Sequence, residues 1–327
     1  MENFKAIEFH QARDFSRKMN ATFEFIKQNF KPLGKCILFI AAPPVLLSTL
    51  LFGSFMGDMF GQSFRPDQAD QMQSYFLSPS FWIQWGLMLV FLTVSAVMNL
   101  ATINNYIILY GEKKSNKIEV SEVWERVRST FWMYLGTMLL FAILATALII
   151  VLFIPLALLG AISPLLVGFG GLLAFIAVFY LVFAGALTFF IRSYENKGFF
   201  DSIFRSFKLV RDKWWSTFGL IFILYFIMGV VSYMFIIPWY IVTAVSAFHN
   251  TSVDTFADPS STWQLMTIIF FTLYYLAQMF LASLPNVGIA FQYFNLVELK
   301  EAKGLMNQIE TVGQSPASSA PMTDEHF

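Results

Sequence analysis

The chain has little cysteine, histidine or charge. Its 327 residues include one cysteine and three histidines, and only 13% of them are charged. Cys36 cannot form an intramolecular disulfide or a thiolate metal cluster on its own. The histidines are too far apart in sequence to suggest a metal site. A soluble domain carries roughly 25% charged residues, and the net charge of zero argues against a nucleic-acid-binding protein.

Motifs typical of pumps and membrane enzymes are also missing. The sequence has neither a G-x-x-x-x-G-K-S/T phosphate loop nor an H-E-x-x-H pair, which argues against an ATPase or a zinc protease. Its first thirty residues are charged and lack a cleavage signature, so we do not interpret them as a signal peptide. We therefore expect an uncleaved protein with no cofactor.

Long apolar segments dominate what remains, since 57% of the chain is hydrophobic. A helix needs about 20 apolar residues to cross a bilayer core of about 30 Å. Six segments meet that requirement, and they cover approximately residues 36–56, 81–110, 131–159, 170–191, 217–238 and 263–297. The sequence therefore predicts an all-α polytopic membrane bundle of about six transmembrane helices.

The distribution of lysine and arginine predicts how this bundle is oriented. If the six spans are correct, one side of the membrane holds 20 of the 21 basic residues, and only Arg65 lies on the other side. Basic loops remain cytoplasmic by the positive-inside rule. Tryptophans cluster near both predicted boundaries, as amphipathic indoles do. We expect a multi-pass protein of the bacterial inner membrane, with both termini in the cytoplasm.

A recurring pattern suggests three copies of one structural unit. A charged, amphipathic stretch precedes each odd-numbered span, at residues 15–30, 120–131 and 199–215. Each even-numbered span ends near a Glu with a Lys close by. We expect each unit to be an interfacial elbow helix followed by a membrane hairpin. Amphipathic helices of this kind lie in the headgroup plane, where their basic residues can meet anionic lipid or dock a protein partner.

The first elbow helix has a distinct predicted polarity. Its apolar stripe consists of Phe15, Met19, Phe23, Ile26 and Phe30. The opposite face is charged, and it carries Asp14, Arg17, Lys18, Glu24 and Lys27.

Three domains follow from this division. Residues 1–35 form a cytoplasmic N-terminal amphipathic segment, and residues 36–298 form the six-helix transmembrane domain. Residues 299–327 form a cytoplasmic tail. This tail becomes small and polar, which predicts that it is mostly disordered.

The six spans contain no lysine, arginine, aspartate or glutamate. This argues against proton-coupled transport, since ionisable groups mark such pathways. Neutral amides remain, and we treat five as candidates for lining a functional cavity: Asn99, Asn105, Gln278, Asn286 and Gln292. Amides within a bundle also commonly bond neighbouring helices. The glycine-rich run 168–171 is predicted to form a tight outer turn rather than a phosphate-binding loop.

Two stretches carry a resemblance to a known group of proteins. They are Asn20-Ala-Thr-Phe-Glu-Phe-Ile-Lys-Gln-Asn-Phe30 and the elbow sequence of residues 199–215, FFDSIFRSFKLVRDKWW. Both resemble uncharacterised six-helix bacterial inner-membrane proteins, a group similar to the membrane domain attached to some glycerophosphodiester phosphodiesterases. The resemblance implies the fold and an inner-membrane location. It implies no catalytic residue in this chain.

Three functions remain open at this point. The first is a non-enzymatic envelope scaffold that organises lipids or a protein partner. The second is a permease-like subunit that moves a neutral or lipidic substrate. The third is a lipid-modifying enzyme, whose acids and bases would have to come from Glu112, Glu119, Glu195 or Asp201; these resemble solvated helix faces. The absence of charge inside the spans favours the first.

Overall fold

The computed structural model describes residues 5–63, 74, 76–249, 259–302 and 306. Every regular element in these residues is helical. Six helical stretches are long and apolar enough to cross a membrane. The predicted all-α class and the predicted number of spans are therefore confirmed.

The described helices form three consecutive hairpins and several short connecting elements. In chain order they are α1 (Phe15–Cys36), α2 (Ala42–Ser63), α4 (Pro79–Lys113), α5 (Val120–Ile162), α6 (Pro164–Ala184), α7 (Thr188–Glu195), α8 (Phe199–Val210), α9 (Trp214–His249), α10 (Pro259–Leu281) and α11 (Ser283–Glu301). A π-helical turn, Ile37–Ala41, joins α1 to α2, and a 3₁₀ turn, Arg211–Lys213, joins α8 to α9.

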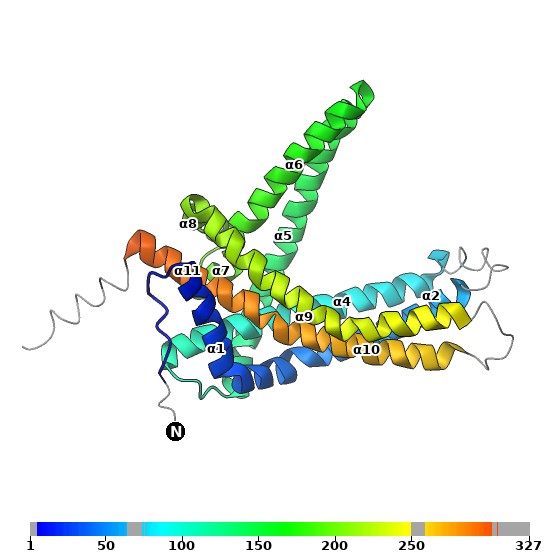
Figure 1. Ribbon diagram of the computed structural model, residues 1–327, viewed down its shortest axis with the longest axis horizontal. Helices are drawn as coiled ribbons and strands as arrows, with labels where there is room; N and C mark the ends of the chain where they lie inside the picture. The colour runs from blue at the N-terminus through cyan, green and yellow to red at the C-terminus, as the bar shows by residue number, and fades with distance from the viewer. Residues whose placement is uncertain (1–4, 64–73, 75, 250–258, 303–305, 307–327) are drawn as a thin grey trace, which may run out of the picture.

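Four of the long helices form the main bundle. Helix α2 contacts α4 and α10, and α10 contacts α9. Figure 1 shows these four helices side by side, while α1 runs across one end and changes direction before α2. That change falls at the π-helical turn, directly before Pro43 and Pro44. Prolines remove backbone donors, which makes this a favourable place for a bend.

Helices α5 and α6 form a hairpin that projects away from this bundle (Figure 1). Between residues 138 and 183 no side chain is buried, although the segment is almost wholly apolar. Helix α5 has 43 residues, which is about 64 Å of helix and twice the thickness of a bilayer core. Helix α5 as a whole is therefore too long for the hydrocarbon region unless it tilts strongly, whereas the 21 residues of α6 match one bilayer core.

The turn of this hairpin differs from the prediction. The glycine-rich run 168–171 lies inside α6 rather than in the turn. The chain reverses instead at Ser163, whose backbone is extended and whose side chain accepts a hydrogen bond from the Leu165 amide. Pro164 occupies the first helical position, where its missing N–H costs no hydrogen bond. A serine cap followed by proline specifies the start of a helix more strongly than neighbouring glycines specify a turn.

A dense aromatic core lies where α1, α4, α7 and α11 meet. Its fully buried members include Phe25, Tyr106, Tyr110, Phe291 and Phe294. The N-terminal segment also contributes to this core, because the ring of Phe9 stacks on Phe294 with a centroid distance of 4.8 Å. Residues 5–35 thus share their packing with the transmembrane helices.

The structure agrees with the predicted faces of α1 only in part. In the predicted apolar stripe, Phe23 is 42% and Phe30 66% exposed, while Met19 and Ile26 are half-buried. Of the predicted charged face only Lys18 is buried, and it lies beside the buried Thr22, Phe25 and Asn29. The grouping of Lys18 with the other charged residues is therefore wrong. An outward apolar face is stable where lipid surrounds the protein, and polar groups can then turn inward to bond other helices.

The elbows also differ from one another. Helix α8 is a separate element that ends at the 3₁₀ turn. By contrast, residues 120–131 continue without interruption into the rest of α5. Helices α4, α7 and α11 nevertheless end in the same way. The residue that follows each of them adopts the left-handed conformation, at Lys114, Asn196 and Ala302. Each of these residues lies one or two positions after a glutamate.

Close packing between α2 and α10 depends on Gly53. A Cβ atom at this position would lie 2.0 Å from Cγ1 and 3.3 Å from Cβ of Ile268. We expect Gly53→Ala to destabilise the protein by about 1–3 kcal/mol, because overpacking forces the two helices apart. Thermal unfolding in detergent, followed by tryptophan fluorescence, would measure the effect.

The matched control for this prediction is Gly86→Ala on α4. A Cβ atom at Gly86 would have nothing within 4 Å. We expect it to raise stability by up to about 1 kcal/mol through its better helix propensity. Equal midpoints for the two variants would show that α2 and α10 do not pack closely at Gly53.

Candidate functional site

Two of the five predicted cavity residues tie α4 to other helices. The Asn99 amide nitrogen donates to the Met279 carbonyl on α10 at 3.3 Å. That carbonyl lies two residues before the end of α10, close to the break between α10 and α11. The Asn105 amide donates to the Thr130 hydroxyl on α5 at 2.9 Å. Both side chains are buried.

Gln292 forms a fully buried polar contact. Its oxygen accepts from Lys18 Nζ at 2.7 Å, and its nitrogen donates to the Thr217 hydroxyl at 2.7 Å. Lys18 Nζ also donates to Ser216 Oγ at 2.8 Å. This amide thus connects α1, α9 and α11. Lys18 is only 2% exposed, and both of these acceptors are neutral oxygens.

The other two candidates bond within their own helices. The Gln278 amide donates to the Tyr274 hydroxyl at 3.0 Å, and the Asn286 amide donates to the Ala282 carbonyl at 2.7 Å. The five amides are spread over several helix contacts rather than gathered around one space. Their role in lining a functional cavity stays a prediction.

A void in the aromatic core is too small for transport. It is lined by Phe9, Phe25, Ile107, Val287, Ala290, Phe291 and Phe294, and it has no room for a water-sized sphere. Its lining is wholly apolar, so a polar solute would find no hydrogen-bonding partner there.

Glu195 is the centre of an ionic cluster at the ends of α7 and α11. Its carboxylate accepts from Arg205 Nε at 3.1 Å and from the Tyr293 hydroxyl at 2.7 Å. Lys197 Nζ lies 2.6 Å from its second oxygen. Arg205 also pairs with Glu301 at 2.5 Å. The cluster joins α7, α8 and α11 and leaves the Glu195 side chain only 10% exposed.

The remaining acidic candidates also have structural roles. Glu112 pairs with Arg126. Glu119 caps the start of α5 in a reciprocal capping box with Glu122. Asp201 lies in the first turn of α8, where a negative charge stabilises the helix. Among the described residues, no group of three His, Cys, Asp or Glu side chains could hold a metal ion.

Arg13 holds the N-terminal segment against the bundle. Its backbone N–H donates to Asn295 Oδ1 at 2.7 Å, and its guanidinium donates to the carbonyls of Phe9 and Glu8. Burial lowers the pKa of the Arg13 guanidinium, while Glu8 and Glu24 oppose this effect. An arginine with these contacts acts as a structural clamp.

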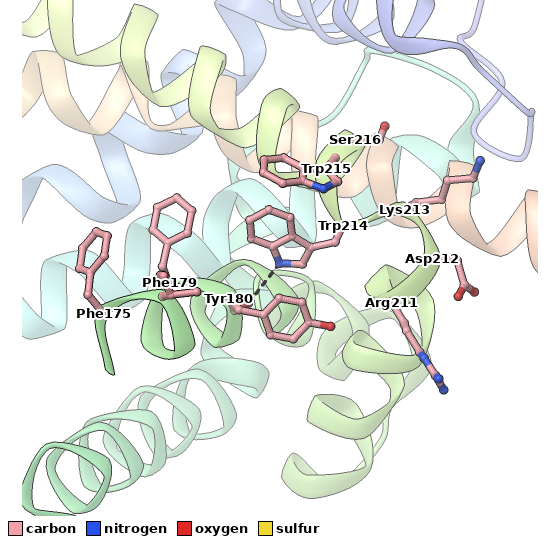
Figure 2. A pocket seen from close by; sticks show the side chains of 10 residues that line it. Phe175, Phe179, Tyr180, Arg211, Asp212, Lys213, Trp214, Trp215 and Ser216 are labelled. Atoms are coloured by element: carbon pink, nitrogen blue, oxygen red, sulfur yellow. Dashed lines mark hydrogen bonds between the residues drawn. The ribbon is translucent and has the colours of Figure 1, made fainter. Parts of the chain in front are cut away.

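A groove of about 820 Å³ lies between α6 and the start of α9. One end is apolar, where Phe175, Ile176 and Phe179 line it. The other end is formed by the 3₁₀ turn, whose charged side chains are exposed. Figure 2 shows the phenylalanines along α6 at one side and Arg211 and Lys213 at the opposite side.

Trp214 forms a fixed wall in the middle of the groove. Its indole N–H donates to the Tyr180 carbonyl at 3.2 Å, which is drawn as a dashed line in Figure 2. Its ring stacks on Tyr180 and on Phe218, with centroid distances of 5.6 and 5.4 Å. The neighbouring Trp215 is 77% exposed. The groove therefore combines a rigid aromatic wall with a cationic rim.

The sequence predicts that the first residues of α9 belong to an elbow, residues 199–215, but it does not predict the groove. The wall requires α6 and α9 to meet near Trp214, and no local periodicity reports that contact. A paired Trp-Trp after a basic turn was the available signal, since both residue types are typical of membrane interfaces.

Comparisons with known proteins give no independent identification. No family model, curated protein or solved structure matches the chain. The coarse conclusion is that the chain is an all-α protein with six helices suited to crossing a membrane.

Proposed function

We propose that this protein is a non-enzymatic, multi-pass protein of the bacterial inner membrane that organises lipids or a protein partner. The observation that carries this proposal is the α5–α6 hairpin. Its residues 138–183 are almost wholly apolar, yet none is buried. Lipid or another membrane protein must surround such a surface.

The polar contacts support a structural role for the rest of the bundle. Asn99, Asn105 and Gln292 each connect different helices. Glu195 is occupied by Arg205, Lys197 and Tyr293. A carboxylate held by several partners is poorly suited to exchange protons with a substrate. These contacts position helices instead.

Exposed aromatics on the elbow segments support their placement at the cytoplasmic interface. Phe15, Phe30, Trp124, Phe200 and Phe204 are all at least 39% exposed. They lie beside basic residues on the same elements. This arrangement suits an amphipathic collar that holds headgroups with its cations and lipid tails with its rings. The similar left-handed ends of α4, α7 and α11 support three related units.

We expect the basic end of the bundle to face the cytoplasm. Cys36 is fully buried, so an impermeant maleimide will not label it in the folded protein. Asn116→Cys should therefore react only after the inner membrane is permeabilised. Asp67→Cys and Asp254→Cys, which lie outside the described residues, should react in intact spheroplasts. Labelling of all three from the same side would contradict the orientation.

The partner-organising role is tested by photocrosslinking from the hairpin. A photoreactive phenylalanine derivative would replace Phe153 on α5, which is 68% exposed. We expect a discrete protein adduct in native membranes. The matched control is Phe226 on α9, which is 62% exposed and lies outside the hairpin. Only lipid adducts at Phe153, with isolation of a monomer, would contradict a protein partner and leave lipid organisation.

A permease-like subunit that moves a neutral or lipidic substrate is the alternative. The groove beside α6 is the observation in its favour, because a lipidic substrate could enter there from the membrane. Reconstituted vesicles that show protein-dependent lipid translocation would support transport over organisation. The apolar void in the core is too small to serve that route.

A further inference from the structure

The groove between α6 and α9 has the polarity of a phospholipid. Its apolar end is lined by Phe175 and Phe179, and its cationic rim by Arg211 and Lys213. Helix α6 runs toward the predicted cytoplasmic side at Ala184, so Phe175 lies deeper in the membrane than Tyr180. The apolar end thus faces the hydrocarbon, and the rim lies at headgroup level.

The rim has an excess of positive charge. Arg211 and Lys213 are exposed, and neither forms an ion pair with another described residue. Asp212 lies between them, but its carboxylate is held by Lys300 at 2.7 Å. Behind the rim, the buried amine of Lys18 bonds Ser216, which also lines the groove. Two exposed cations and a third close behind them leave this end complementary to an anion.

We propose that this groove binds one anionic phospholipid of the cytoplasmic leaflet. Arg211 binds its phosphate, Lys213 adds positive charge on the other side of the 3₁₀ turn (Figure 2), and an acyl chain lies against Phe175, Phe179 and Trp214. Arginine suits this task because its planar guanidinium meets two phosphate oxygens at once. This inference rests on the proposed membrane function and its orientation.

An anionic headgroup fits better than a zwitterionic one. A zwitterionic lipid carries its own ammonium group, which two neighbouring cations would repel. An anionic lipid keeps its net negative charge and meets no competing cation. We therefore expect selectivity by headgroup charge, with the aromatic wall supplying affinity that is independent of the headgroup.

The test measures lipid binding to the purified full-length chain. Native mass spectrometry in detergent would titrate phosphatidylglycerol and phosphatidylcholine separately. We expect one phosphatidylglycerol to bind about 10-fold more tightly than phosphatidylcholine. The double variant Arg211→Gln/Lys213→Gln should remove this preference. The control Lys117→Gln/Arg128→Gln removes the same two charges from exposed positions outside the groove, and it should retain the preference.

A second variant tests the apolar wall. Trp215 lines the groove and is 77% exposed, so Trp215→Ala should fold normally. We expect this change to weaken the binding of both lipids by a similar factor and to leave the ratio of their affinities unchanged. Glycerol phosphate, which has no acyl chain, should not displace the bound lipid. Displacement by glycerol phosphate would identify a soluble phosphate ester as the occupant and overturn the proposal.

Other outcomes would also overturn it. Equal binding of the two lipids would show that anionic lipid is attracted to the protein surface in general. Equal losses of the phosphatidylglycerol preference in the groove variant and the control variant would show the same. A dimer whose formation excludes lipid would identify a second copy as the occupant. Failure of the lipid proposal alone would leave the maleimide pattern and the Phe153 adduct intact. Failure of the proposed function would change those two results.

Discussion

Replacing Gln292 with leucine is expected to destabilise the bundle by about 1–3 kcal/mol, because buried polar partners lose their hydrogen bonds. The amide is fully buried and accepts from Lys18 at 2.7 Å while donating to Thr217. Leucine would leave the Lys18 amine with Ser216 as its remaining hydrogen-bond acceptor. Thermal unfolding in detergent, followed by tryptophan fluorescence, would report the lower midpoint.

The Lys18 side of the same contact should behave differently. We expect Lys18→Met to cost about 1 kcal/mol, since it removes a buried charge while leaving the neutral Gln292 oxygen without its donor. The double variant Lys18→Met/Gln292→Leu should be more stable than Gln292→Leu alone, because the stranded amine is gone. The double-mutant cycle would give a coupling of about 1–2 kcal/mol.

A matched control separates this contact from the general loss of an amide. Gln278 donates to Tyr274 on its own helix, so Gln278→Leu should cost below about 1 kcal/mol. Additive effects of Lys18→Met and Gln292→Leu would contradict the contact. A Gln278→Leu midpoint as low as that of Gln292→Leu would do the same.

Removing the Glu195 carboxylate is the second change with a large expected effect. Glu195→Ala should cost about 2–3 kcal/mol, because charged hydrogen bonds to Arg205, Lys197 and Tyr293 are lost together. This expected loss is smaller than the roughly 3–5 kcal/mol that results when one partner of a fully buried ion pair is removed. Arg205 is 16% exposed and keeps Glu301 as a partner. Unfolding midpoints in detergent would measure it.

Glu112 supplies the control for Glu195. It ends α4 in a corresponding way and pairs with Arg126, but its side chain is 52% exposed. Surface ion pairs contribute about 0–1 kcal/mol, so Glu112→Ala should leave the midpoint nearly unchanged. Equal losses for the two variants would show that the extra partners and burial of Glu195 contribute nothing. A normal midpoint for Glu195→Ala would exclude it as a structural centre.

The candidate site was only partly predictable. Asn99 and Gln292 stand out in the sequence because amides in apolar helices need hydrogen-bonding partners. Their contacts could not be predicted, because each partner is more than 70 positions away in sequence. The groove depends likewise on where α6 meets Trp214. Lys18 was misplaced, since helical periodicity defines faces without saying which face meets lipid.

Composition and charge by themselves determined the all-α class and the number of spans, and they predict a cytoplasmic basic end. Each property is local, because a bilayer requires about 20 apolar residues from every spanning helix regardless of its neighbours. Only the tertiary structure decided that α5 and α6 stand apart, that Lys18 turns inward and that a groove opens beside Trp214. Within a membrane, lipid tails are as apolar as leucine, so an apolar helix face gains nothing in hydropathy by contacting another helix instead of lipid. The hydropathy of the sequence therefore does not show which helices contact each other. Close packing at positions such as Gly53 and a few interhelical hydrogen bonds select among them.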